Sequence, residues 1–328
     1  MLNKGKKILV TGVAGFIGSK TAEILLSQGA KVVGVDNLCD AYDIRLKKYR
    51  LSRLSGTPGF KFHRADVSDA SRIAPLFRSF RPQAVINLAA RAGVRYSIEN
   101  PRVYLEANTL GTMNLLELCH KYGTKKFVLS STSSLYASEP MPFRESQPVN
   151  TPISPYAATK KAAEAFCYTY HHLYGIDVTV FRYFTVYGPA GRPDMSYFKF
   201  IRNIQEGRPI VVYGDGRQSR DFTYIDDIAE GTVLGLRQVG YGVFNLGGQE
   251  RHRLNEMITL IEKCLGRRAK IKYLPSHPAD MRDTQADNRL ARTRLGWKPR
   301  VKFETGIRNT VKWFLENESL VRRLRVES

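Results

Sequence analysis

The sequence predicts an α/β fold: a doubly wound parallel sheet with a smaller C-terminal α/β lobe. Short apolar runs rich in β-branched residues alternate with longer helical patterns as far as Arg182, and a glycine-rich turn follows the first run. Strands that alternate with helices form right-handed βαβ units, which place helices on both faces of a parallel sheet. After Arg182 proline and glycine become more frequent and the segments shorten. We therefore expect a first domain over residues 1–182 and a second lobe over residues 183–328.

Each strand expected in the first domain is a short run whose residue types favour β structure. Most of these runs are almost continuously apolar, as in strands buried on both faces, whereas FKFHRA alternates. A further run, YGVFNLGG at 241–248, is expected to return to the main sheet, and Ser154 followed by Pro155 marks a helix start. The expected strands are 7–11, 31–36, 60–65, 84–88, 126–130 and 178–182, and the expected helices are 20–27, 71–80, 103–122 and 156–174.

Composition narrows the classes of partner. The formal net charge is +21, but lysines and arginines are spread along the chain without a basic block interleaved with aromatic residues, so we expect no nucleic-acid partner. No apolar run approaches the ~20 residues of a membrane span, so we expect no membrane partner. The four cysteines are scattered without a CxxC pair. This pattern predicts a cytoplasmic protein without a metal site.

A glycine-rich turn follows the first strand and opens the first helix. Residues 10–19 read VTGVAGFIGS, with Gly12, Gly15 and Gly18 in a GxxGxxG pattern. The first glycine permits the tight turn, the second lets the backbone approach a pyrophosphate, and the third lets the helix pack closely on the strand. The free N–H groups at the start of the helix favour the anion. We therefore expect a Rossmann-type domain that binds NAD, with Phe16 and Ile17 also at the cofactor.

An acidic residue, Asp36, ends the second strand and indicates which dinucleotide binds. Its carboxylate would accept hydrogen bonds from the ribose 2′-hydroxyl of NAD and repel the 2′-phosphate of NADP. The alternative is that Asp36 caps the helix that follows. More cofactor contacts are expected where the third and fourth strands end, although small residues there also serve close packing. The further residues assigned to the cofactor are Asn37, Asp66, Val67, Leu88, Ala89, Ala90 and Asn108.

Hydroxyl groups cluster at the end of the fifth strand, and a tyrosine–lysine pair opens a later helix. The strand ends in SSTSSLY (130–136), at the edge where parallel sheets bind ligands. Tyr156 and Lys160 lie one helical turn apart, so the ammonium should favour the phenolate and lower the pKa of the tyrosine. Such a tyrosine can take a hydroxyl proton while NAD takes a hydride, with Thr132 at the same hydroxyl and Lys160 also near the nicotinamide ribose. The alternative is a solvated helix face, since YxxxK is common.

These motifs resemble those of the extended short-chain dehydrogenases/reductases, and within them the nucleotide-sugar 4-epimerases. GxxGxxG, NLAA and YxxxK are shared by the superfamily. The stretches NLCDAYDIRLKKYRL (37–51), ARAGVRYSIENP (90–101) and VYGPAGRPDM (186–195) are similar to those of UDP-glucuronate 4-epimerases, and RDFTYIDD (220–227) is shared more widely. The resemblance covers nearly the whole chain. It departs at Arg91, where the subfamily usually has glutamine, at Ala190, where tryptophan is common, and at 277–280.

The resemblance implies a UDP-sugar substrate and the residues that bind it. Arg192 is a candidate cation for the substrate carboxylate, either in direct contact or through a neighbouring group, with capping of a loop carbonyl as the alternative. Arg95 would contact the substrate or form an ion pair with Glu99. The other implied contacts are Tyr183 beside the nicotinamide, Ser133, Ser134 and Thr185 at the sugar, Val211 and Tyr213 near the uracil, and Arg220 and Arg282 at the diphosphate.

The residues after Thr132 distinguish the reactions known in the superfamily. The 4,6-dehydratases carry an Asp-Glu pair there and the UDP-glucuronate decarboxylases resemble TSE, whereas here Ser133 and Ser134 follow. A dehydratase needs an acid and a base to eliminate water, and no carboxylate follows Thr132 here, so the sequence disfavours a dehydratase. The resemblance then implies 4-epimerisation of UDP-glucuronate to UDP-galacturonate: oxidation at C4, rotation of the 4-keto sugar, and return of the hydride to the other face.

Several alternatives stay open at this point. The nearest is a UDP-glucose/UDP-galactose 4-epimerase, which shares the fold, the cofactor and the tyrosine–lysine pair. A UDP-glucuronate decarboxylase is disfavoured by Ser134. A non-catalytic NAD-binding regulator or an RNA-associated protein on the same fold is a third, because fold does not fix function. The resemblance also implies a homodimer in which helices 103–122 and 156–174 pair with those of a second copy.

Overall fold

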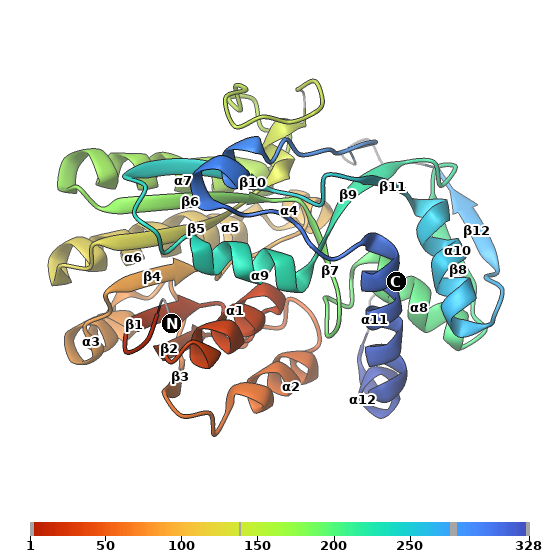
Figure 1. The fold of residues 1–328 in the computed structure, drawn as a ribbon, viewed down its shortest axis with the longest axis horizontal. Helices are drawn as coiled ribbons and strands as arrows, with labels where there is room; N and C mark the ends of the chain where they lie inside the picture. The colour runs from red at the N-terminus through yellow and green to blue at the C-terminus, as the bar shows by residue number, and fades with distance from the viewer. Residues whose placement is uncertain (1–2, 138, 276–280, 326–328) are drawn as a thin grey trace.

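The computed structural model describes residues 3–137, 139–275 and 281–325, and it contains a seven-stranded parallel sheet (Figure 1). The strand order is β10-β6-β5-β4-β1-β2-β3, so the chain winds in both directions from the middle of the sheet. This confirms the doubly wound fold expected from the sequence. The sheet strands are β1 (Lys7–Thr11), β2 (Lys31–Asp36), β3 (Phe60–Arg64), β4 (Ala84–Asn87), β5 (Lys126–Thr132), β6 (Asp177–Tyr183) and β10 (Tyr241–Leu246).

Helices cover both faces of this sheet because successive strand residues point to opposite faces. Ile8 and Val10 of β1 pack in one apolar cluster with α1 (Phe16–Ser27) and α9 (Ile225–Leu234). Leu9, between them, packs in a second cluster with α3, α6 and α7 on the opposite face. All three β1 side chains are fully buried. These helices are α3 (Ala70–Phe80), α6 (Gly111–Tyr122) and α7 (Pro155–Tyr174).

Two segments beyond residue 182 also belong to the core of this first domain. β10 pairs in parallel with β6, which confirms the returning strand expected near 241–248. Helix α9 contributes buried Ile228 and Val233 to the apolar cluster beneath β1. The chain therefore returns to the main sheet after it has begun the second lobe.

The helix expected over 103–122 is built from three consecutive pieces. They are α5 (Pro101–Tyr104), a π-helical turn (Leu105–Leu110) and α6. π-Helical turns recur at functional sites, and this one carries Asn108. The Asn108 side chain accepts a hydrogen bond from the Arg91 backbone N–H at 2.9 Å and donates to the Thr159 hydroxyl at 3.1 Å. The turn therefore joins α7 to the loop after β4.

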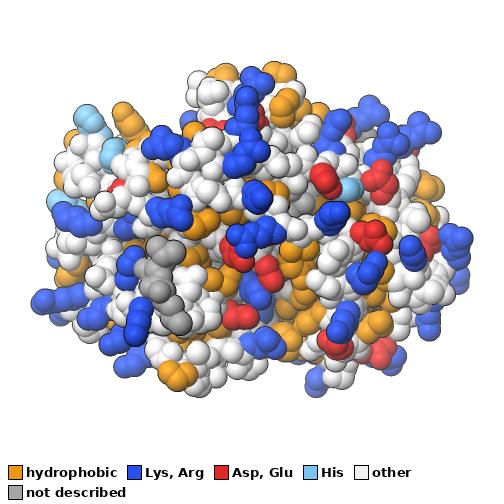
Figure 2. All heavy atoms as spheres, in the orientation of Figure 1, with side chains coloured by type: hydrophobic (Ala, Val, Ile, Leu, Met, Phe, Trp, Pro, Cys, Tyr) orange, Lys and Arg blue, Asp and Glu red, His pale blue; other side chains and the backbone are white. Residues whose placement is uncertain are grey.

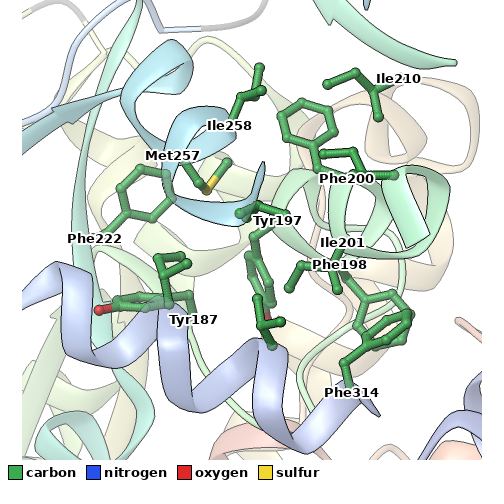
Figure 3. Close-up of a cluster of buried hydrophobic side chains, with 14 of the residues drawn as sticks. Tyr187, Tyr197, Phe198, Phe200, Ile201, Ile210, Phe222, Met257, Ile258 and Phe314 are labelled. Atoms are coloured by element: carbon green, nitrogen blue, oxygen red, sulfur yellow. The ribbon is translucent and has the colours of Figure 1, made fainter. Parts of the chain in front are cut away.

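The second lobe has an aromatic core of its own (Figure 3). Tyr187, Tyr197, Phe198 and Phe314 meet there, from segments far apart in the chain. The segment after Trp313, which the sequence suggested to be a solvated helix end, adds buried Val321 to this core. The elements are β7 (Thr185–Tyr187), α8 (Ser196–Gln205), β8 (Ile210–Tyr213), β9 (Ser219–Tyr224), β11 (Arg251–Arg253), α10 (Leu254–Leu265), β12 (Ile271–Leu274), α11 (Phe303–Glu316) and α12 (Glu318–Arg323). A π-helical turn (Ala291–Leu295) before α11 packs instead in the apolar cluster of the main sheet.

The surface carries lysine and arginine side chains over the whole visible face and not in one patch (Figure 2). None of the helices in the described part of the chain has the length and apolarity needed to cross a bilayer.

The remaining helices lie in the connections of the first domain and are α2 (Ile44–Leu54), α4 (Val94–Glu99) and a 3₁₀ turn (Ser133–Tyr136).

Candidate active site

The glycine-rich turn brings the backbones of three segments into close contact. Gly12 has φ +66°, and a Cβ there would lie 2.6 Å from the Leu88 carbonyl oxygen and the Ala89 nitrogen. A Cβ on Gly18 would lie 2.1 Å from the Gly12 carbonyl oxygen. Gly15 precedes α1, and no side chain caps this helix. The first N–H groups of α1 are therefore available to a pyrophosphate, as NAD requires.

Asp36 faces this turn from the end of β2. Its carboxylate accepts hydrogen bonds from the backbone N–H groups of Ala14 at 3.1 Å and Leu38 at 2.8 Å, and Lys47 Nζ lies 3.5 Å away. The following helix, α2, is capped by Asp43. The capping role considered for Asp36 is therefore wrong. Asp36 instead lines one cavity together with Gly12 and Gly15, and its contact with the NAD ribose stays a prediction.

Asp66 and Asn37 form a polar pair close to Asp36. Asn37 Nδ2 donates to Asp66 Oδ2 at 2.6 Å, and the Ser68 backbone and hydroxyl donate to Asp66 Oδ1. Partial burial would raise the pKa of Asp66, but these hydrogen bonds lower it overall. Asp66 is therefore an ionised acceptor at neutral pH.

One cavity collects most of the residues assigned to the cofactor. Val67 and the backbone after β4 complete its wall. Lys47 of α2 and Tyr42, in the turn before that helix, also line the cavity, and the sequence did not predict their contribution. The amphipathic pattern of 44–54 could have identified that helix. The fit supports NAD, because the glycines admit a pyrophosphate and the carboxylates lie at the nucleoside end. The assigned residues that line the cavity are Gly12, Gly15, Asp36, Asn37, Asp66, Val67, Leu88, Ala89 and Ala90.

The remaining cofactor assignments do not line this cavity. Phe16, Ile17 and Gly18 form the first turn of α1, and Asn108 lies behind the wall, bonded to Arg91. Tyr183 lies in the apolar core, where its hydroxyl and that of Thr232 are 2.8 Å apart. The roles of these residues at the cofactor stay predictions.

Tyr156 lies in the first turn of α7, where Ser154 caps the helix by accepting a hydrogen bond from the Ala157 N–H at 3.2 Å. Burial raises the pKa of Tyr156, although a hydrogen bond with Thr132 and the charge of Arg192 both act to lower it. The sequence argument expected a lowered pKa, and this expectation is wrong for the structure as it stands. Because the Thr132 side chain acts on this pKa, the Tyr156 phenol lies near the end of β5.

Lys160 is buried beneath Tyr156 and points to β5. Its Nζ donates to the Ser130 carbonyl oxygen at 2.8 Å. Burial lowers the pKa of Lys160 to about 8, and Glu164 acts in the opposite direction. The ammonium is therefore close to losing its proton under mildly alkaline conditions.

A buried ion pair lies next to Lys160 and was missed by sequence reasoning. Arg182 Nε and Nη2 donate to the two Glu164 carboxylate oxygens at 2.9 and 2.7 Å, and the Ser131 hydroxyl donates to Glu164 Oε1 at 2.6 Å. Arg182 Nη1 also donates to the Tyr136 hydroxyl at 2.8 Å. Both charged side chains are about 4% exposed. No local motif marks such a pair, because its members come from α7 and β6.

A second cavity collects residues assigned to the sugar and diphosphate. Ser133, Ser134, Thr185 and Arg220 line it together. The Thr132 hydroxyl donates to the Ser134 hydroxyl at 3.1 Å, so the hydroxyls form one chain from β5 into this cavity. Among the described residues that line it, none is aspartate or glutamate. The wall is therefore compatible with an anionic sugar.

The other predicted substrate residues are not among the described residues that line this cavity, and their roles at the substrate stay predictions. Arg192 donates to the Ala92 carbonyl oxygen at 3.4 Å and forms an ion pair with Asp194 at 2.6 Å. The Arg95 guanidinium lies 4.4 Å from the centre of the Tyr213 ring, which links α4 to the second lobe. Val211 and Tyr213 are both exposed on the same face of β8. The Arg282 carbonyl oxygen accepts a hydrogen bond from Arg220 at 2.8 Å. The departure at 277–280 lies outside the described residues.

Changing Gly18 to alanine should weaken NAD binding by at least about tenfold, because the added methyl group would displace the Gly12 carbonyl and the turn around it. Titration of the protein with NAD by calorimetry measures the loss. Lys20→Ala, on the same helix and partly exposed, serves as the control. Wild-type affinity in Gly18→Ala would contradict the assignment of the turn to the cofactor.

The comparisons with known proteins agree with this geometry. A UDP-glucuronate 4-epimerase of Thermodesulfobacterium geofontis is 53% identical over 319 residues, with 97% of this chain and 99% of the relative covered. UDP-glucuronic acid 4-epimerase from Bacillus cereus, solved with UDP-glucuronic acid and NAD, has a TM-score of 0.89 and 36% identity, covering 94% of this chain and 99% of that one. Thermotoga maritima UDP-glucose 4-epimerase, solved with UDP-glucose, has a TM-score of 0.86 and 32% identity, covering 95% and 99%.

The expected resemblance is confirmed, and its extent settles the family. The model of the GDP-mannose 4,6 dehydratase family matches residues 9–310. This match includes the glycine-rich turn, the hydroxyl cluster after β5, and the Tyr156–Lys160 pair. The chain belongs to the GDP-mannose 4,6 dehydratase family.

Proposed function

We propose that this protein is an NAD-dependent UDP-glucuronate 4-epimerase that forms UDP-galacturonate. The observation that carries the proposal is the cavity where Ser133, Ser134 and Thr185 lie beside the Thr132–Tyr156 pair, with no carboxylate among its described lining residues. A dehydratase would need an acid–base pair there. Both the 53% identical relative and the Bacillus cereus structure are UDP-glucuronate 4-epimerases.

The cofactor would lie across the glycine-rich turn. The first N–H groups of α1 would hold its pyrophosphate and Asp36 its ribose, while Asp66 would accept from the adenine amino group. When bound, NAD supplies a hydride acceptor that returns the hydride later in the cycle. Lys160, beneath Tyr156, would hold the nicotinamide ribose and thereby turn its ammonium away from Ser130.

Tyr156 is the proposed base for the sugar 4-hydroxyl. Burial raises the pKa of this phenol, so the ionised form depends on the hydrogen bond with Thr132 and the charge of Arg192, both of which lower the pKa. Movement of the Lys160 ammonium toward the phenol would lower it further. Tyr156 would then take the proton of the 4-hydroxyl as the hydride leaves C4, and would return this proton to the carbonyl oxygen when the hydride returns to the opposite face of the keto sugar.

The substrate carboxylate makes this reaction difficult. A 4-keto uronic acid is a β-keto acid, and it loses CO₂ when the bond to the carboxylate stands perpendicular to the carbonyl plane. The hydroxyls of Ser133, Ser134 and Thr185 would hold the carboxylate out of that orientation without adding negative charge. Arg192 would provide a cation on the same side.

The protein is also proposed to work as a cytoplasmic homodimer. Large apolar side chains are exposed on two helical segments that pack on each other: Leu105 (54%) and Leu110 (37%) in the π-helical turn, and Tyr168 (55%) and Leu173 (59%) on α7. Two copies that pack these helices together would bury them. The four cysteines are free thiols, as is usual in the cytoplasm.

A product assay tests the proposed function. The protein is incubated with NAD and either UDP-glucuronate or UDP-glucose, and the sugars are followed by proton NMR. We expect UDP-galacturonate from the acid without a UDP-pentose. Formation of UDP-galactose from the neutral sugar alone would instead indicate a hexose epimerase, and UDP-pentose as the main product would indicate a decarboxylase.

Replacing Ser134 with glutamate should raise the share of UDP-pentose product about tenfold, the effect of a change of about 1.4 kcal/mol between competing barriers. The new carboxylate would repel that of the substrate and release it from the restraining hydroxyls. Ser134→Gln, which has the same size without the charge, is the matched control. An unchanged product ratio in an active Ser134→Glu variant would show that this position does not restrain the carboxylate.

A further inference from the structure

A buried arginine joins the glycine-rich turn to the loop that carries Arg192. Arg50, on α2, has 2% of its surface exposed. Its Nη1 donates to the Ala14 carbonyl oxygen, inside the turn, at 3.2 Å. Its Nε and Nη2 donate to the Ala190 carbonyl oxygen at 3.0 and 2.7 Å, and Nη2 also donates to that of Gly191 at 3.1 Å. One guanidinium therefore bridges the predicted cofactor cradle and a loop of the substrate side.

The bridge is held from its other sides as well. The Tyr42 hydroxyl accepts a hydrogen bond from Arg50 Nη1 at 2.6 Å. The guanidinium also lies 5.7 Å from the Phe16 ring centre and 5.4 Å from that of Tyr42. A planar guanidinium presents its donors in a fixed fork, whereas a lysine ammonium is a single flexible point charge. The relative placement of the two segments therefore follows the orientation of the Arg50 fork.

The loop that Arg50 contacts has an unfavourable backbone conformation. Ala190 has φ +56°, a left-handed value that a residue with a Cβ rarely adopts. A Cβ on the next residue, Gly191, would lie 1.9 Å from the Tyr197 hydroxyl oxygen, so the loop is also packed tightly from below. Such conformations persist only where neighbouring groups stabilise them. The carbonyl oxygen of Ala190 itself accepts two hydrogen bonds from Arg50.

The loop in turn places Arg192 at the reaction centre. Arg192 follows Gly191 directly, and its charge acts on the phenol of Tyr156. A continuous series of contacts thus leads from Ala14 through Arg50 to the residue beside the proposed base.

We propose that Arg50 couples the two halves of the active site, so that a dinucleotide on the glycine-rich turn orders the Arg192 loop for the substrate carboxylate. The inference rests on the proposed function and deepens it. Arg50 acts as a positioning residue, because it lies between the two sites and touches them through backbone carbonyls. Binding of either ligand then orders both the turn and the loop, so each ligand should strengthen the binding of the other.

The coupling can be measured by binding without turnover. NADH is titrated into the protein by its fluorescence, with and without saturating UDP-glucuronate, because NADH and this substrate cannot react with each other. We expect UDP-glucuronate to tighten NADH binding roughly tenfold in the wild type, within the usual range for allosteric coupling. In Arg50→Met the ratio should fall to within about twofold of unity, with a raised KM for UDP-glucuronate and a smaller change in kcat.

Two further variants complete the test. Arg53→Met, an exposed position one turn along α2, should retain the wild-type ratio. Arg50→Lys keeps the charge but not the fork, so it should give an intermediate ratio, and it replaces Arg50→Met if that variant fails to fold. If folded Arg50→Met or Arg50→Lys shows the same ratio as the wild type, the proposed coupling is overturned and the proposed function is not. A ratio of one measured in the wild type itself has the same consequence. A wild type that binds UDP-glucuronate but makes no UDP-galacturonate overturns the proposed function and leaves the coupling standing.

Discussion

Changing Tyr156 to phenylalanine is expected to lower kcat by at least about 10³-fold, because a positioned acid–base group contributes roughly 10²–10⁴-fold. The variant should still bind NAD, because Tyr156 is not among the described residues that line the cavity assigned to the cofactor. The rate is measured by proton NMR of UDP-glucuronate turnover, and NAD binding by calorimetry.

A neighbouring tyrosine provides the matched control. The Tyr104 ring packs edge to face on Tyr156 at 6.0 Å between ring centres, and its hydroxyl donates to the Ala92 carbonyl oxygen at 3.4 Å. Burial raises the pKa of Tyr104 to about 12, so this phenol stays protonated. Tyr104→Phe should keep most of the activity. Near-normal turnover in Tyr156→Phe would remove Tyr156 as the base.

Changing Glu164 to glutamine is expected to lower the free energy of unfolding by about 3–5 kcal/mol, which is usual when one partner of a buried ion pair is removed. Arg182 would keep its charge in a site where only 4% of its side chain is exposed. Urea denaturation measures this loss. The double variant Glu164→Gln/Arg182→Met removes both charges and should recover part of the stability.

The same variant has a consequence for the pH dependence of activity. Glu164 opposes the effect of burial on Lys160, whose pKa is about 8. Without this carboxylate the pKa of Lys160 falls further, so the ammonium loses its proton at lower pH. The alkaline decline of kcat should therefore begin at lower pH in Glu164→Gln than in the wild type. An unchanged profile between pH 6 and 9.5, in a folded variant, would show that Glu164 has a structural role only.

The parts of the site that the sequence predicts well are those encoded by short segments. Gly12 follows the buried strand β1 directly and Gly18 lies in the first turn of α1, so the spacing of the motif alone places both glycines at the strand-to-helix turn. Ser154, as a helix cap, places Tyr156 in the first turn of α7. Asp36 ends β2, and its hydrogen bond to Ala14 needs only the pairing of adjacent strands.

The parts that the sequence could not predict depend on contacts between distant segments. In the sequence, the pattern around Arg50 is that of a surface helix with many charged residues. Its contact with Ala190 depends on how the fold brings these distant segments together. Glu164 lies one turn beyond Lys160, but its partner Arg182 comes from β6. The raised pKa of Tyr156 has the same origin, because burial depends on the whole domain and spacing along a helix does not determine it.

The return of β10 to the edge of the sheet means that the two lobes cannot be separated by cutting the chain once. A fragment ending at residue 182 would leave the outer edge of β6 unpaired and would lack Ile228 and Val233 of α9 over the apolar face of β1. An open strand edge beside uncovered apolar side chains promotes association between copies. The cofactor half is therefore completed by α9 and β10, which are translated after β7, α8, β8 and β9 of the substrate half.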